Sequence, residues 1–71
     1  MSIHLNGQAT TLDNVQTVQD LITHLGYQDK RIAVERNGDI VPRSQHATTQ
    51  LADQDHLEIV IAVGGGINPD I

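Results

Sequence analysis

Residues 55–66 read Asp55-His56-Leu57-Glu58-Ile59-Val60-Ile61-Ala62-Val63-Gly64-Gly65-Gly66. The run from His56 to Val63 is the most apolar of the chain. Its leucine, isoleucines and last valine share one face in a period of two, and Glu58, Val60 and Ala62 share the other, which is typical of a β-strand. A strand that is apolar on both faces is usually central in its sheet, or it exposes a contact surface. We therefore expect a central strand that leads directly into three glycines.

The opening residues predict a hairpin. Ile3 and Leu5 alternate with polar residues, as in a half-buried strand. Asn6-Gly7 follows, and both of these residues tolerate the positive φ that two-residue hairpin turns require. Gln8 to Leu12 is then expected to form the returning strand.

One amphipathic helix is expected after this hairpin. Thr17 and Asp20 have the spacing of a capping box, in which a hydroxyl and an acid satisfy free N–H groups at a helix start. Apolar residues then recur at helical spacing and form one stripe, namely Val18, Leu21, Ile22 and Leu25. Gly26 is placed to end the helix in a left-handed cap. The stripe must be buried against the sheet, since the chain offers no other partner.

The middle of the chain predicts a second hairpin. Ile32 to Glu35 alternates as a third strand, and Asn37-Gly38 is again a two-residue turn. Ile40 and Val41 continue the sheet until Pro42, which cannot donate to a strand ladder. Three short elements are expected before the last strand: a helical turn at Ser44 to Ala47, an edge strand at Thr48 to Leu51 and a polar turn at Ala52 to Asp55.

The order β-β-α-β-β-β predicts an α+β fold. A right-handed crossover places the last strand beside the first, in the middle of one mixed sheet with the helix on one face. This is the ubiquitin-like β-grasp architecture. We expect residues 1–63 to form this domain, and residues 64–71 to form a flexible glycine-rich tail with an extension.

Composition disfavours several classes of protein. The 71 residues suffice for one domain but hardly for a catalytic cleft as well, and the absence of cysteine excludes disulfides and thiolate chemistry. The net charge of −5 disfavours nucleic acid and anionic membranes, and it fits a soluble, cytoplasmic protein that docks on a basic partner surface. We see no signal peptide and no run long enough to span a membrane. The chain is therefore expected to be neither an enzyme nor a cofactor protein.

The polar residues do not predict a metal or catalytic site. The four histidines are expected at the surface or at sheet edges, because none forms a helical i, i+4 pair: His4, His24, His46 and His56. The acids Asp53, Asp55 and Glu58 are interpreted as a solvated turn, with possible attraction to a basic partner. Val60 and Ala62, with Ala33 nearby in the predicted sheet, are expected to form an exposed apolar patch. We interpret this patch, with Glu58, as a partner-docking surface rather than as ordinary sheet surface.

Two segments resemble the ThiS family, the sulfur carriers of thiamine thiazole synthesis. They are Ala33-Val34-Glu35-Arg36-Asn37-Gly38-Asp39-Ile40-Val41-Pro42-Arg43 and the run from Asp55 to Gly66, and the resemblance extends over residues 1–66. It implies that an E1-like adenylyltransferase uses ATP to adenylate the carboxylate of Gly66. A sulfur donor then makes the thiocarboxylate, and thiazole synthase takes the sulfur. The carrier would supply only this carboxyl group and a docking surface.

The glycines also have a physical reason. Without a Cβ, Gly64 and Gly65 could pass through a narrow channel that β-branched residues would block. The chain departs from the family by continuing beyond Gly66 with Ile67-Asn68-Pro69-Asp70-Ile71, so that Gly66 carries an amide instead of a free carboxylate. Three explanations are open: a protease trims the extension, the five residues are an artificial addition, or sulfur transfer is lost and only binding remains. We favour trimming.

Other functions stay open at this point. The chain could serve a different sulfur pathway, as molybdopterin-type carriers do, although its central run resembles those carriers less. It could be an interaction domain that transfers nothing, because its tail is blocked, or a modifier that is joined to lysines. Which of Gly65 and Gly66 is the functional terminus also stays open, and the family pattern favours Gly66.

Overall fold

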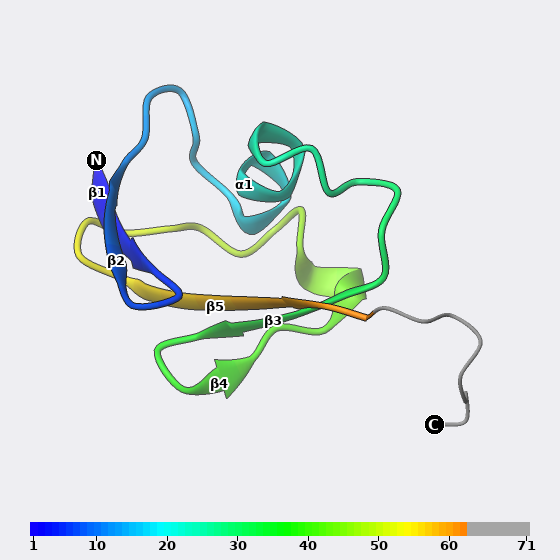
Figure 1. The fold of residues 1–71 in the computed structure, drawn as a ribbon. Helices are drawn as coiled ribbons and strands as arrows, with labels where there is room; N and C mark the ends of the chain where they lie inside the picture. Colours follow the sequence, from blue (N-terminus) through cyan, green and yellow to red (C-terminus); the bar gives the residue numbers. More distant parts are fainter. Residues whose placement is uncertain (63–71) are drawn as a thin grey trace.

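A computed structural model describes residues 1–62. The sheet contains five strands, which are β1 (Ser2–Leu5), β2 (Gln8–Thr11), β3 (Ile32–Arg36), β4 (Asp39–Ile40) and β5 (His56–Ile61). Their spatial order is β2-β1-β5-β3-β4, with β1 and β5 parallel and the other neighbours antiparallel. The helix α1 (Val18–His24) lies across one face (Figure 1). The expected mixed sheet, with the last strand central and beside the first, is confirmed.

Both hairpins turn through the expected asparagine-glycine pairs. Asn6 and Gly7 have φ of 52° and 84°, and Asn37 and Gly38 have φ of 52° and 89°. Positive φ at both turn residues twists the chain in the sense of the flanking strands. Asn6 has a second function, because its side-chain amide accepts from the Ile59 N–H at 2.9 Å and donates to the Ile59 carbonyl at 3.3 Å. The Asn6 side chain thus continues the short β1–β5 ladder by one further step.

The helix begins and ends as its sequence predicts. The Thr17 hydroxyl accepts from the Asp20 N–H at 3.1 Å, and the Asp20 carboxylate accepts from the Thr17 N–H at 3.1 Å. The Asp20 carboxylate also accepts from the Gln16 N–H, and these two backbone hydrogen bonds hold the Asp20 pKa below its ordinary value. Gly26 follows the helix with φ of +77°. The apolar stripe of α1 faces the sheet, where Val18, Leu21 and Ile22 are buried.

The expected edge strand at Thr48 to Leu51 is wrong. In this segment the structure shows a single bridge between Thr17 and Gln50. Its backbone is engaged with the helix start instead, because the Thr49 carbonyl accepts from the Val18 N–H at 3.0 Å. The carbonyl of His46 likewise accepts from the Gln19 N–H at 2.9 Å. These bonds satisfy N–H groups that an α-helix leaves without an internal partner.

The remaining expectations differ in detail. The helical turn predicted at Ser44 to Ala47 is a 3-10 turn, η1 (Arg43–Gln45), and the last strand ends at Ile61. The core is entirely aliphatic and lies between α1 and the sheet; its largest fully buried side chains are Ile3, Val18, Leu21, Val34 and Leu57. The boundary expected after Val63 and the tail at 64–71 lie outside the described residues. Within residues 1–62, no helix is long and apolar enough to cross a membrane.

Candidate functional site

The outer face of β5 carries the residues expected to dock a partner. Alternation along the strand buries Leu57 and Ile59 against the helix layer and turns Glu58 and Val60 outward. Val60 is 63% exposed, which is unusual for a valine in the central strand of a sheet. Ala62, which follows the strand, is also exposed. Gly64, Gly65 and Gly66, where the reacting carboxyl was expected, lie outside the described residues.

Val60 and Ala62 line a groove at the end of β5. Ala33 lies directly opposite Val60 in the β3–β5 register, so the three small apolar residues are neighbours as expected. Ile32 and two arginines, Arg31 and Arg43, complete the lining. The sequence analysis missed both arginines. Arg31 comes from the residue before β3 and Arg43 from the start of η1, and no local pattern relates the two positions.

The charge on the outer face changes beside this groove. Glu58 lies directly opposite Glu35 in the β3–β5 register. Along each strand, this pair is two residues away from the Val60–Ala33 pair. Like charges in directly opposed positions destabilise a sheet. The described residues contain one ion pair, between Arg36 and Asp55, so no cation within salt-bridge distance neutralises this glutamate pair. Glu58 is therefore exposed and acidic, as the docking interpretation requires.

Asp55 is buried, which corrects its interpretation as part of a solvated turn. It is 6% exposed, and its carboxylate accepts from Arg36 Nε at 2.7 Å, Asn37 Nδ2 at 3.0 Å and the Ala52 N–H at 2.8 Å. Burial raises the pKa of Asp55, but the hydrogen bonds from Asn37, Ala52 and Arg36, together with the Arg36 charge, outweigh it and hold the pKa below its ordinary value. This network fastens the β3–β4 turn to the start of β5.

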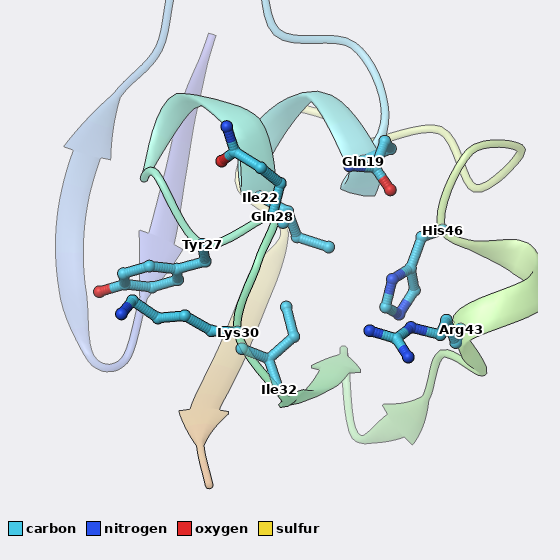
Figure 2. A pocket seen from close by; sticks show the side chains of 8 residues that line it. All are labelled: Gln19, Ile22, Tyr27, Gln28, Lys30, Ile32, Arg43 and His46. Atoms are coloured by element: carbon cyan, nitrogen blue, oxygen red, sulfur yellow. The ribbon is translucent and has the colours of Figure 1, made fainter. Parts of the chain in front are cut away.

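His46 is also buried, so the expectation of a surface histidine is wrong at this position. It is 6% exposed, and its Nε2 lies 3.1 Å from the Val41 carbonyl, which can only accept. Figure 2 shows the His46 ring pointing into a small pocket between α1 and η1, beside Arg43. The imidazole lines this pocket and donates to one backbone carbonyl five residues before it, a role that the alternation of residue types does not reveal.

The other histidines lie on the surface, as expected. His4 and His56 are opposite one another on the parallel strands β1 and β5, and their rings stack with centroids 4.4 Å apart and planes 17° apart. His24 is exposed in the last turn of the helix. Among residues 1–62, no three histidine or acidic side chains are grouped so that they could hold a metal ion.

Comparison with known proteins gives consistent similarities. The sequence model of the ThiS family matches residues 3–66. The chain is 40% identical over 50 residues to the sulfur carrier protein ThiS of Bacillus subtilis, covering 70% of this chain and 76% of that one. A crystal structure of the thiamine biosynthesis protein ThiS from Geobacter metallireducens superposes with a TM-score of 0.78 at 30% identity, covering 93% of this chain and 100% of the other.

A further similarity is to part of a larger protein. A Paramagnetospirillum magneticum protein named thiazole synthase is 41% identical over 66 residues, which are 93% of this chain and 20% of that protein. The chain spans about a fifth of the length of the thiazole synthases that it matches.

Proposed function

This chain belongs to the ThiS family of sulfur carriers for thiamine biosynthesis, and from that membership we propose that it carries sulfur as a thiocarboxylate on Gly66. An oxygen of the Gly66 carboxylate attacks the α-phosphorus of ATP on an E1-like adenylyltransferase, and pyrophosphate leaves. Hydrosulfide released by a sulfur donor then attacks the carbonyl carbon and AMP leaves, which gives the thiocarboxylate. The chain contributes no catalytic group to these steps. We place the reaction in the cytoplasm, where ATP is available.

The position of the groove on β5 carries this proposal. One central strand bears the exposed residues Val60 and Glu58 and leads into the Gly64-Gly65-Gly66 segment. A partner that binds the groove is therefore bound only a few residues along the chain from the reacting carboxyl group. Such placement makes the transfer step effectively intramolecular, which is the main contribution a carrier can make to rate.

Thiazole synthase is the proposed sulfur acceptor. The similarity of this chain to a segment of proteins named thiazole synthase supports the choice, because there a carrier-like sequence and the name of the acceptor enzyme belong to one polypeptide. The same similarity favours the thiazole pathway over a molybdopterin-type pathway. The exposed groove residues would serve both enzymes in turn, since the adenylyltransferase must release the carrier before the synthase binds it.

The proposal requires cleavage after Gly66. The sequence continues with Ile67-Asn68-Pro69-Asp70-Ile71, and an amide at Gly66 cannot attack ATP as a carboxylate does. We propose that a protease removes these five residues. An interaction domain that transfers no sulfur is the alternative, and it is favoured by the same five residues if they persist.

Intact-mass analysis of the protein purified from its own cells tests the proposal. We expect a species that ends at Gly66, with a fraction heavier by the difference between one sulfur and one oxygen atom. Treatment with an alkylating reagent should increase the mass of this heavier fraction by one alkyl group and leave the carboxylate form unchanged, because the thiocarboxylate sulfur is a much stronger nucleophile than a carboxylate oxygen. A single species that ends at Ile71 would contradict trimming and support the interaction domain.

Substituting Val60 tests the docking surface. Val60→Asp places a charge among the apolar residues that line the groove, and we expect it to weaken binding of the adenylyltransferase by about tenfold or more, because a charge buried in an interface without a partner is costly. Isothermal titration calorimetry measures the change. Thr11→Asp, an exposed position in the edge strand β2, is the matched control and should bind normally. Equal affinity of both variants would exclude the groove as the docking surface.

A further inference from the structure

The basic residues of this acidic chain are distributed unevenly. The chain has four of them, and Arg36 is paired with Asp55 at 2.7 Å. Arg31 and Arg43 are exposed and line the groove together with Val60 and Ala62. The single ion pair among residues 1–62 does not involve them, so neither guanidinium has a carboxylate of the described part of the chain within salt-bridge distance. We call Arg31 and Arg43 the arginine pair.

The arginine pair lies where β5 ends. The Ala62 N–H donates to the Arg31 carbonyl at 2.9 Å, so the backbone of Arg31 is fixed to the last described residue of the chain. Arg31 therefore lies beside Ala62, which precedes Gly64 by two positions in the sequence. The glutamate pair, Glu35 and Glu58, lies two residues along the strands from Ala33 and Val60. At the usual rise per residue, this separation is about 7 Å along the strand.

We propose that the arginine pair binds a carboxylate side chain of the enzyme that receives the tail. The inference rests on the proposed function and names the chemistry of the partner surface: an acidic residue beside the channel entrance, next to an apolar strip. Guanidinium groups bind carboxylates through two parallel hydrogen bonds, which fix orientation as well as position. The glutamate pair would repel the same carboxylate. The carrier therefore docks with the arginine pair, and not the glutamate pair, toward the channel entrance.

A nucleotide phosphate is the competing anion, and the groove favours the carboxylate. Apart from the two arginines, the lining of the groove is apolar: Ile32, Ala33, Val60 and Ala62. Apolar surface with a few charged residues at its rim is typical of a protein–protein contact. The net charge of −5 predicts that most of the partner surface facing this chain is basic. At the end of β5, where the arginine pair lies, we expect the partner surface to be acidic instead.

Lys30 provides a matched control. It is adjacent to Arg31 in the sequence and is also exposed, but it does not line the groove. It lines the pocket on the helix side, which Arg43 also lines, and Figure 2 shows the Lys30 side chain beside Tyr27 and the Arg43 side chain at the other end of the pocket, beside His46. Lys30→Glu therefore makes the same charge reversal as Arg31→Glu outside the groove.

The test is the rate of association with the E1-like adenylyltransferase of the same organism, measured by stopped flow at low and high salt, with and without ATP. We expect the double variant Arg31→Glu, Arg43→Glu to associate about tenfold or more slowly at low salt, and the difference from the wild type to shrink at high salt, where repulsion between the introduced glutamates and the partner carboxylate is screened. Lys30→Glu should stay within about twofold of the wild type. Circular dichroism verifies folding, and the milder pair Arg31→Gln, Arg43→Gln replaces the double reversal if that variant unfolds.

Two results would overturn the inference while leaving the proposed function intact. In the first, the double variant associates no more slowly than Lys30→Glu. In the second, it is impaired only when ATP is present, which would assign the arginine pair to a nucleotide phosphate. Failure of the wild-type carrier to bind the adenylyltransferase at all would instead overturn the proposed function, and this inference with it.

Discussion

When the chain is shortened to end at Gly66, we expect the adenylyltransferase to convert it to the acyl-adenylate and, with a sulfur donor, to the thiocarboxylate. The 71-residue chain should give neither product. The reason is chemical, since residues 67–71 leave Gly66 with an amide and move the free carboxylate to Ile71, whose branched side chain suits a glycine channel poorly. Mass spectrometry of the carrier after incubation with ATP measures both products.

The glycine segment itself is tested in the shortened chain. Gly65→Val should reduce the rate of adenylation by about a hundredfold, because a β-branched residue cannot follow glycine through a narrow channel and would displace the carboxylate from ATP. Its affinity for the adenylyltransferase should change much less, because the groove on β5 is intact. A chain ending at Gly65 is the length control and should be a poor substrate. Equal adenylation of the shortened and the full-length chain would contradict the assignment of Gly66 as the reacting terminus.

The elements that the sequence predicts correctly depend on local signals. Asn6-Gly7 and Asn37-Gly38 form the turns because their own φ preferences suffice, and Thr17 with Asp20 forms the capping box within one helical turn. The alternation in His56–Ile61 likewise decides which residues of β5 face outward. The exposed Val60 and Ala62 follow from that alternation and from the central place of the strand.

The features that the sequence does not predict depend on contacts between distant segments. Asp55 has the composition of a turn residue, but Arg36 and Asn37 reach it from the neighbouring hairpin and make its burial favourable. The Thr48 to Leu51 segment has strand-like residues, but the free N–H groups at the start of α1 compete for its carbonyls. Arg31 and Arg43 meet in one groove only because β3 and η1 are brought together.

Asp55→Ala should lower the free energy of unfolding by about 3 kcal/mol, the largest stability effect that we expect for a polar residue here. The substitution removes three hydrogen bonds to a buried carboxylate, from Arg36, Asn37 and the Ala52 N–H. The side chain of Arg36 is 32% exposed, so it stays partly hydrated and limits the loss. Urea denaturation followed by circular dichroism measures the change. Asp53→Ala is the control: this exposed neighbour accepts mainly from the Ser2 N–H, and its removal should change stability much less.

The same carboxylate predicts a dependence on pH. Because the pKa of Asp55 is lower in the folded than in the unfolded protein, its contribution is fully present above the ordinary value of 3.8 and is lost as pH falls through the folded value. The stability difference between the wild type and Asp55→Asn should therefore be constant at neutral pH and shrink below about pH 4. A difference that stayed constant in acid would mean that packing, and not the charge of Asp55, fastens the β3–β4 turn to β5.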